Sequence, residues 1–454
     1  MNTPLVVHDR LIPLLQELVR NRCINDGTAE SGHETRSAQS LANFLRSYGV
    51  ESEMLGPDPS RQSLIARIPG TDPMAPSLMF LGHTDVVPAK AEDWTVDPFA
   101  GELRDGCIWG RGTLDMLNMT SAMAVAVAER SARGDSFPGD VLFLAVADEE
   151  ASGRLGARWL VENEWQRVKA DYMVGELGGY NIVTDNGPAM TITLGEKGVC
   201  WVRISVRGVA GHGSTPYMAS SAVTKIAQAI ERISSYRPKI VMTPLFEQMA
   251  NGLVRGRVRR LLARTPWGLD AVLSRLYREH PGEAKFLHAA SRMTVNPGIV
   301  QGGSKINIIA DRAEAYLDIR IMPGQSVEFV QEQLRAAVGS LAGELLIEFT
   351  EFFPSNTTES GTALEQATAR IVQDMYPGTT LVPMLVGGVT DGRYWRQRGT
   401  RVCGFTLYDR EMTATRFSSM IHGKDERVSI ESLQRSLEYF YRLPEEFYNC
   451  NPRP

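Results

Sequence analysis

The chain has 454 residues, of which 43% are hydrophobic and 22% are charged, a balance typical of a globular protein long enough for two domains. Its net charge of −5 argues against nucleic acid as the main partner, because phosphate binding requires a basic surface. No apolar run approaches the roughly 20 residues that span a bilayer, so we expect no membrane span.

The first segment, MNTPLVVHDRLIPLLQELVR, mixes charges into an apolar pattern and lacks the features of a signal peptide. It predicts an amphipathic helix from Leu5 to Arg20. The cysteines are scattered, odd in number and without a CxxC pair: Cys23, Cys107, Cys200, Cys403 and Cys450. This usage favours a reducing compartment, so we expect a cytoplasmic protein.

Helical and strand patterns alternate over the first third of the chain. We expect helices at 34–48 and 120–133, and strands at 63–68, 78–81, 141–146 and 172–174. This alternation predicts an α/β domain, a mixed sheet flanked by helices. In such sheets reactive side chains collect beyond the carboxyl ends of the strands. His83, the acidic run Asp148 to Glu150, and Glu176 all fall there.

A different order, β-α-β-β-α-β, begins near Thr193. Its expected strands are 199–206, 293–300, 315–321 and 345–349, and its expected helices are 221–233 and 327–338. This order is typical of a ferredoxin-like α+β domain. The α/β pattern resumes after Pro354, with a helix at 363–375 and strands at 381–386 and 402–407. We therefore expect an inserted domain at 193–352 and a discontinuous α/β domain at 1–192 and 353–454.

The inserted domain carries a further insertion at about 238–291, which contains the basic segment VRGRVRRLLAR. Its pattern favours a solvated lid helix. Contact with a membrane surface is the alternative, and a nucleic-acid adaptor is a more remote one.

Acids and histidines gather in five short segments: GHTDVVP, GRGTLDM, ADEEASG, VGELGG and IHGKDE. Each alone has an ordinary explanation, such as a structural histidine or a solvated acidic turn. Together they offer two imidazoles and three carboxylates, the donors that zinc prefers. The set is His83, Asp115, Glu150, Glu176 and His422. It suffices for one bridging ligand and two terminal ligands on each of two metal ions.

Two further acids have expected roles beside these ligands. Asp85, two residues after His83, is placed to accept the ring N–H that the metal does not use. Glu149, beside Glu150, is free to take a proton from water bound at the metal.

With these motifs the chain resembles the metallopeptidase family of aminoacylase, succinyl-diaminopimelate desuccinylase, acetylornithine deacetylase, carboxypeptidase G and the carnosine dipeptidases. The resemblance covers nearly the whole chain. It implies a zinc-hydrolase catalytic domain with an inserted lid and dimerisation domain. It also implies two Zn²⁺ ions, or Co²⁺ or Mn²⁺ in their place, bridged by Asp115. His83 and Glu176 would complete one site, Glu150 and His422 the other, and Glu149 would be the general base.

One motif departs from the family pattern. Asp-Met-Lys-Gly usually follows the bridging position, whereas this chain has Asp115-Met116-Leu117-Asn118. The lysine is not a ligand, so the metal assignment is unaffected. The departure argues against close identity with the best-known desuccinylases.

The resemblance also implies substrate contacts from the inserted domain and from a glycine-rich loop. His212 would hold the oxyanion across a dimer, or else be a turn histidine bonded to Ser214 or Thr215. Arg320 would bind a carboxylate, or else pair with Asp318 or Asp311. Further expected contacts come from Asn307, Gly387 and Gly388.

The expected activity is cleavage of an amide bond in a small substrate with a free carboxylate, such as an N-acyl amino acid or a C-terminal peptide. The resembling family has glutamate or aspartate at the position of Glu176, and glutamate favours this class of substrate. The alternatives are a metal-dependent dipeptidase or aminopeptidase and, more remotely, a non-catalytic small-molecule binding protein. We expect a homodimer formed through the inserted domain, and neither nucleic acid nor membrane as a partner.

Overall fold

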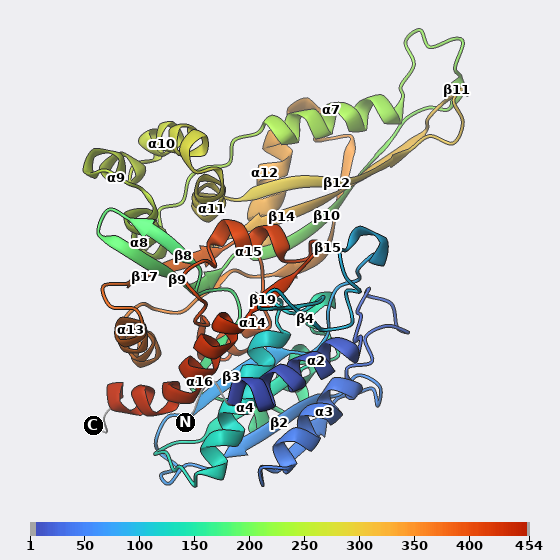
Figure 1. Ribbon diagram of the computed structural model, residues 1–454. Helices are drawn as coiled ribbons and strands as arrows, with labels where there is room; N and C mark the ends of the chain where they lie inside the picture. The colour runs from blue at the N-terminus through green and yellow to red at the C-terminus, as the bar shows by residue number, and fades with distance from the viewer. Residues whose placement is uncertain (1–5, 452–454) are drawn as a thin grey trace. The chain divides into compact units, whose positions relative to one another are not determined.

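The computed structural model describes residues 6–451, which fall into two units. The first unit contains the described residues up to Leu194, then Thr358–Met384, and the described residues from Thr390 onward. The second contains Gly195–Thr357 and Leu385–Val389. Figure 1 shows the elements of both units.

A mixed sheet lies mostly in the first unit, and its last strand, Asn356–Thr357, belongs to the second. Its order is β1-β2-β6-β3-β7-β18-β9-β16, with β8 and β17 also paired to β9. The bounds are β1 Ser52–Leu55, β2 Ser63–Ile68, β3 Leu78–His83, β6 Val141–Val146, β7 Tyr172–Gly175, β8 Asn181–Thr184, β9 Gly187–Glu196, β16 Asn356–Thr357, β17 Thr380–Val386 and β18 Arg401–Gly404.

Strands β6, β3, β7 and β18 run parallel, whereas β2 and β9 pair antiparallel at their flanks. Each residue of β6 (VLFLAV) is buried, as a parallel strand covered on both faces requires. The carboxyl ends of the parallel strands therefore meet at one edge of the sheet.

Helices flank this sheet. They are a π-helical turn at Val7–Leu11, α2 Ile12–Arg20, α3 Thr35–Arg46, α4 Leu117–Ala132, α5 Ala157–Asn163, α6 Trp165–Val168, α13 Ala363–Met375, α14 Gly392–Arg396, α15 Ala414–Met420 and α16 Ile430–Cys450. The small side chains of α4 let it pack against β3, α2 and α16. A separate three-stranded sheet joins β4 Glu102–Arg104, β5 Cys107–Trp109 and β19 Arg427–Ser429.

The second unit contains a four-stranded antiparallel sheet in the order β12-β14-β10-β15. The strands are β10 Gly198–Arg207, β12 Thr294–Gly302, β14 Arg312–Ile321 and β15 Leu345–Phe353. Helices α7 Ala222–Ser235 and α12 Val327–Val338 pack on it, and their apolar residues form one core with those of the strands. Strand order and chain order together give the ferredoxin-like arrangement expected from the sequence.

Two features extend from this sheet. A two-stranded ribbon pairs β11 Gly211–His212 with β13 Ile308–Ile309. A helical insertion between α7 and β12 consists of α8 Pro244–Leu253, α9 Arg257–Ala263, α10 Pro266–Glu279 and α11 Pro281–Ser291.

Some sequence expectations need correction. The first helix contains a π-helical turn before α2, and its expected start, Leu5, lies outside the described residues. The strand expected at 402–407 ends at Gly404, since the chain turns there to pass the loop after β7. A Cβ added at Gly404 would lie 1.9 Å from the carbonyl oxygen of Glu176. Between residues 6 and 451, no helix is both long and apolar enough to cross a bilayer.

Candidate metal centre

The candidate site forms where three parallel strands end. His83 is the last residue of β3 and lies opposite Val146, the last residue of β6. The acidic turn of Glu149 and Glu150 follows β6, and Glu176 follows β7. These side chains meet because the strands are parallel neighbours, as the sequence predicts.

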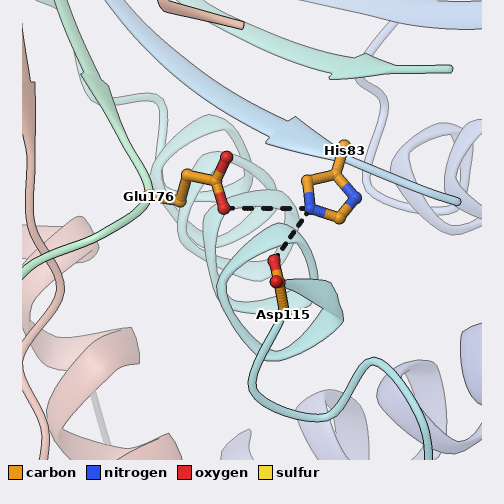
Figure 2. A group of neighbouring side chains, drawn as sticks. All are labelled: His83, Asp115 and Glu176. Atoms are coloured by element: carbon orange, nitrogen blue, oxygen red, sulfur yellow. Dashed lines mark hydrogen bonds and ion pairs between the residues drawn. The ribbon is translucent and has the colours of Figure 1, made fainter. Parts of the chain in front are cut away.

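Asp115 and His422 reach the same place from loops. Asp115 lies two residues before α4, and His422 two residues after α15. Figure 2 shows Asp115 and Glu176 both directed at the ring of His83.

Two groups of three potential ligands share Asp115. His83, Asp115 and Glu176 form one group, and Asp115, Glu150 and His422 form the other. Within each group the ligand atoms all lie within 4.8 Å of one another. The structure thus brings together all five residues that the sequence analysis selected.

The two carboxylate oxygens of Asp115 face different histidines. Oδ1 lies 3.1 Å from Nε2 of His83, and Oδ2 lies 3.1 Å from Nε2 of His422. Nε2 of His83 is also 3.9 Å from Glu176 Oε2, and Nε2 of His422 is 3.3 Å from Glu150 Oε2. A carboxylate with one oxygen in each group has the geometry of a bridge.

Proton placement on His83 indicates that a cation fits this site. Its Nδ1 lies 2.9 Å from the backbone carbonyl of Asp85, to which it donates. In the neutral ring, Nε2 then carries only a lone pair, yet it faces two carboxylates. Either a proton or a metal ion must sit between them. The donor set of two imidazoles and three carboxylates suits zinc and similar divalent ions.

The pKa values of these side chains in the folded protein reflect their crowding. Burial alone would lower the pKa of His83, but its contacts with Asp115 and Asp85 raise it well above its ordinary value. Hydrogen bonds to Asp115 and Glu150 raise the pKa of His422 to about 10. Burial raises the pKa of Glu176 well above its ordinary value, and the charge of Glu149 adds to this. These raised pKa values show that the site favours positive charge between its side chains, which a bound cation would also supply.

Glu149 lies beside the ligands without belonging to either group. Its side chain is partly buried. Burial raises its pKa well above the ordinary range, and the charge of Asp391 acts in the same direction. A carboxylate with a raised pKa near bound water is suited to accept and return a proton.

Asp85 contacts His83 and also supports the neighbouring turn. His83 bonds to its backbone carbonyl, while its carboxylate oxygen Oδ1 is 3.5 Å from the ring nitrogen. That carboxylate also accepts the backbone N–H groups of Glu149 and Glu150, at 3.1 and 3.0 Å. It also accepts the side-chain amide of Asn25 at 2.9 Å. Asp85 therefore fixes the turn that carries both glutamates.

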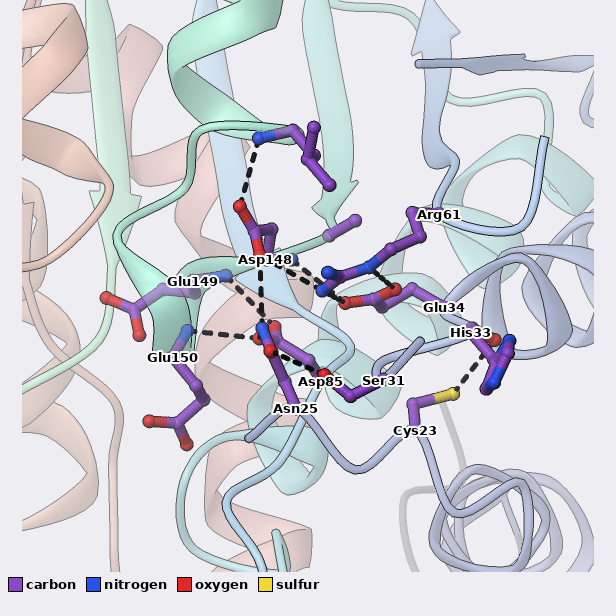
Figure 3. A network of polar contacts seen from close by, with 12 residues as sticks. Cys23, Asn25, Ser31, His33, Glu34, Arg61, Asp85, Asp148, Glu149 and Glu150 are labelled. Atoms are coloured by element: carbon purple, nitrogen blue, oxygen red, sulfur yellow. Dashed lines mark hydrogen bonds and ion pairs between the residues drawn. The ribbon is translucent and has the colours of Figure 1, made fainter. Parts of the chain in front are cut away.

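A buried ion cluster supports the same turn, and the sequence analysis missed it (Figure 3). Arg61 donates from Nε to Glu34 Oε2 at 2.8 Å and from Nη2 to Asp148 Oδ1 at 3.0 Å. Asp148 also accepts from Asn25 and from the backbone N–H of Leu155. It has φ of 68°, a costly conformation for a residue with a side chain. The cluster holds that backbone in place.

A second ion pair, also missed, positions Asp115. Glu426 is fully buried and pairs with Arg111 at 2.6 Å. Its other oxygen accepts the backbone N–H groups of Leu114 and Asp115. Arg111 and Glu426 both lie within motifs that the sequence analysis quoted, GRGTLDM and IHGKDE, but their pairing has no local sequence signal.

The expected substrate residues of the second unit are placed as follows. His212 and Asn307 are exposed and lie at adjacent positions of the β11–β13 ribbon, where His212 pairs with Ile308. Nδ1 of His212 contacts the hydroxyl of Ser214 at 2.7 Å and accepts its backbone N–H at 3.2 Å. Nδ1 is thus the acceptor, so the neutral ring carries its proton on Nε2.

The other expected contacts are an arginine and two glycines. Arg320, on β14, makes the ion pair with Asp318 that the sequence analysis kept as an alternative, with Nε 2.8 Å from Oδ1. Gly387 and Gly388 follow β17, and Gly388 is exposed.

Comparisons with known proteins show the family of this chain. The model of peptidase family M20/M25/M40 matches residues 79–446. A probable carboxypeptidase S-like 2 from Dictyostelium discoideum is 27% identical, over 84% of this chain and 73% of its own. The human N-fatty-acyl-amino acid synthase/hydrolase PM20D1 is 28% identical, over 83% and 75%. Human aminoacylase-1 is 27% identical, over 83% and 81%.

Solved structures share the fold. An M20 family metallo-carboxypeptidase from Sulfolobus solfataricus superposes with a TM-score of 0.70 at 18% identity, covering 97% of this chain and 99% of its own. Human carnosine dipeptidase 1 gives a TM-score of 0.69 at 16% identity, covering 98% and 97%. This chain belongs to peptidase family M20/M25/M40 and is a metal-dependent hydrolase that acts on amide bonds.

Proposed function

We propose that the protein is a two-zinc hydrolase that cleaves the amide bond of a small, carboxylate-bearing substrate, such as an N-acyl amino acid or a C-terminal peptide. Co²⁺ or Mn²⁺ could replace zinc at the same donors. The observation that carries the proposal is Asp115, whose two oxygens each face a different histidine. A neighbour of the same fold from Bacillus subtilis, described as a dinuclear metal binding peptidase, supports two ions.

In this proposal Asp115 would be shared by the two ions, His83 and Glu176 would help to hold one, and Glu150 and His422 would help to hold the other. The ions supply a polarised substrate carbonyl and a water of lowered pKa. Glu149 accepts the proton of that water as it attacks and then delivers the proton to the leaving amine. Asp85 keeps Glu149 at the required position through its backbone N–H.

The second unit supplies the remaining contacts. His212 donates from Nε2 to the oxyanion of a neighbouring subunit's substrate, because Nδ1 already accepts from Ser214. Asn307, next to the pairing partner of His212, contacts the same substrate. Arg320 binds its carboxylate by exchanging Asp318 for it, and the backbone of Gly387 and Gly388 offers further N–H donors. This arrangement requires a homodimer formed through the second unit.

The cysteines support a reducing, cytoplasmic location. Each of the five is free, and Cys23, Cys200 and Cys403 are buried. Burial raises the pKa of their thiols, which makes them unreactive.

A substrate panel with Glu149→Gln tests the proposal. Metal-loaded protein should hydrolyse N-acetyl amino acids faster than unblocked dipeptides, because this substrate class needs no free amino group. Glu149→Gln should keep its metal and lose at least about a hundredfold in kcat. Glu162→Gln, an exposed glutamate on α5, serves as the control and should match the parent.

Three outcomes would contradict the proposal. Full activity of Glu149→Gln would remove Glu149 as the base. A preference for dipeptides with a free amino group would favour the dipeptidase or aminopeptidase alternative. Tight binding of substrate without turnover in metal-loaded parent protein would favour a non-catalytic binding protein.

A further inference from the structure

The helical insertion of the second unit differs in charge from the rest of the chain. Residues 238–291 contain nine lysines and arginines against four acids, a net charge of +5, whereas the whole chain has −5. A segment that is this basic within an acidic protein has a local potential of its own.

The four acids of the insertion are already included in this net charge. Three of them are already held by arginines: Glu247 by Arg264, Asp270 by Arg292, and Glu279 by both Arg259 and Arg275. Glu283, the fourth, is partly buried. Arg257 and Arg278 are exposed and have no acidic partner among residues 6–451. A net positive surface therefore remains around α9 and α10.

Large apolar side chains are exposed on the same two helices. Val258 and Leu261 are 72% and 69% exposed and lie one turn apart on α9, so they share a face. Trp267, in the first turn of α10, is 76% exposed. We name Val258, Leu261 and Trp267 the apolar tip.

The apolar tip is not part of the insertion's core. That core comes from other residues, including Phe246 and Met249 of α8 and Leu269 and Leu276 of α10, all buried. Helices α9 and α10 lie side by side (Figure 1), and Arg259 of α9 pairs with Glu279 of α10 at 2.9 Å. The helices are thus held in a hairpin that leaves the apolar tip in solvent.

A short helix with apolar residues in solvent and arginines around them has the character of a segment that lies on an anionic lipid surface. Tryptophan favours the headgroup region, and arginine is attracted by acidic headgroups. Nucleic acid would match the arginines but not the apolar tip, and an acidic protein would need an apolar groove beside its acids. An anionic lipid surface offers both the charge and an apolar layer.

We propose that the hairpin of α9 and α10 docks the protein on an anionic membrane surface, with the apolar tip inserted among the headgroups and Arg257 and Arg278 facing acidic lipids. The sequence alone favours a solvated lid helix for this segment. The exposure of the apolar tip favours the alternative, contact with a membrane surface. Docking does not depend on the proposed hydrolytic function.

Vesicle sedimentation with the full chain tests this proposal. The protein should bind vesicles of phosphatidylcholine with phosphatidylserine, bind pure phosphatidylcholine much more weakly, and dissociate as salt is raised. The triple variant Val258→Ser, Leu261→Ser, Trp267→Ser should bind at least tenfold more weakly. The pair Arg257→Gln and Arg278→Gln should lose roughly fivefold per arginine, since each adds about 1 kcal/mol near an acidic surface.

Two matched controls isolate the surface. Met74→Ser removes an exposed apolar side chain of the first unit, and Lys90→Gln removes an exposed cation there. Both should bind vesicles like the parent, and all variants should keep the parent's melting temperature and its activity on a soluble substrate. Parent protein that does not bind acidic vesicles, or apolar-tip variants that bind them unchanged, would overturn the proposal. Equal retention on duplex DNA or polyglutamate would overturn it too.

Discussion

Replacing Arg61 by methionine should destabilise the first unit strongly. Only 3% of the Arg61 side chain is exposed, and its partners Glu34 and Asp148 are 0% and 5% exposed. Methionine fills similar space but leaves two carboxylates buried without their cation. Removing one member of a buried ion pair costs about 3–5 kcal/mol. We expect a loss of this size in the free energy of unfolding at neutral pH.

A neighbouring arginine, six positions along the chain, provides a control. Arg67, on β2, pairs with Asp140 at the surface, where the two side chains are 38% and 32% exposed. Because exposed pairs contribute about 0–1 kcal/mol, Arg67→Met should change stability by less than about 1 kcal/mol. The comparison separates the effect of burial from the loss of an arginine.

Removing a second charge should restore part of the loss. In the double variant Glu34→Leu, Arg61→Met, the remaining Asp148 keeps the bonds from Asn25 and from Leu155, at 3.1 and 2.9 Å. The double variant should therefore be more stable than Arg61→Met alone.

The assay is urea unfolding of the full chain at neutral and at acidic pH, with fluorescence used to monitor the transition of the first unit. Without Arg61, the buried carboxyls have folded-state pKa values above those of the unfolded chain. The folded state then binds more protons, so the deficit of Arg61→Met should shrink as the pH falls. A loss below about 1 kcal/mol, or one equal to that of Arg67→Met, would refute the reasoning.

Three other predictions concern single buried groups. Asp85→Asn can no longer accept both backbone N–H groups of Glu149 and Glu150, so metal affinity, measured by chelator competition, should fall about 10–100-fold; unchanged affinity would contradict this. Burial raises the pKa of Asp391 to about 7, so the parent should lose stability as the pH rises from about 4 to 7. Asp391→Asn should lack that loss in urea unfolding. Identical stability profiles against pH for the variant and the parent would contradict this prediction. Burial lowers the pKa of Lys197 to about 7, so the unfolded chain alone binds that proton between about pH 7 and 10. The parent should gain up to about 1.4 kcal/mol per pH unit relative to Lys197→Met over this range; a constant difference would contradict it.

The sequence predicts that three of the five proposed ligands lie together, because their positions follow from strand ends. A buried apolar run ends at Val146 and another at Gly175, and parallel neighbours end at the same edge. His83, Glu150 and Glu176 therefore meet by topology. Asp115 and His422 come from loops, and only the motifs around them, compared with a known family, indicated that they join the others.

The supporting ion pairs could not be predicted in this way. Glu34 and Arg61 are 27 positions apart, and Arg111 and Glu426 are 315 apart, so no periodicity connects them. The support that the Asp85 carboxylate gives to the turn of Glu149 and Glu150 likewise has no sequence signal. The chain after β3 brings both the carbonyl and the carboxylate of Asp85 near Nδ1 of His83, at 2.9 and 3.5 Å. Such backbone turns are set by the surrounding packing, which a sequence pattern does not contain.

Anomalous diffraction at the zinc edge, from crystals of the zinc-loaded protein, tests the central claim most directly. We expect two peaks about 3.5–4 Å apart, one on each side of the Asp115 carboxylate, with His83 beside one and His422 beside the other. A single peak, or two peaks that do not share Asp115, would contradict the account.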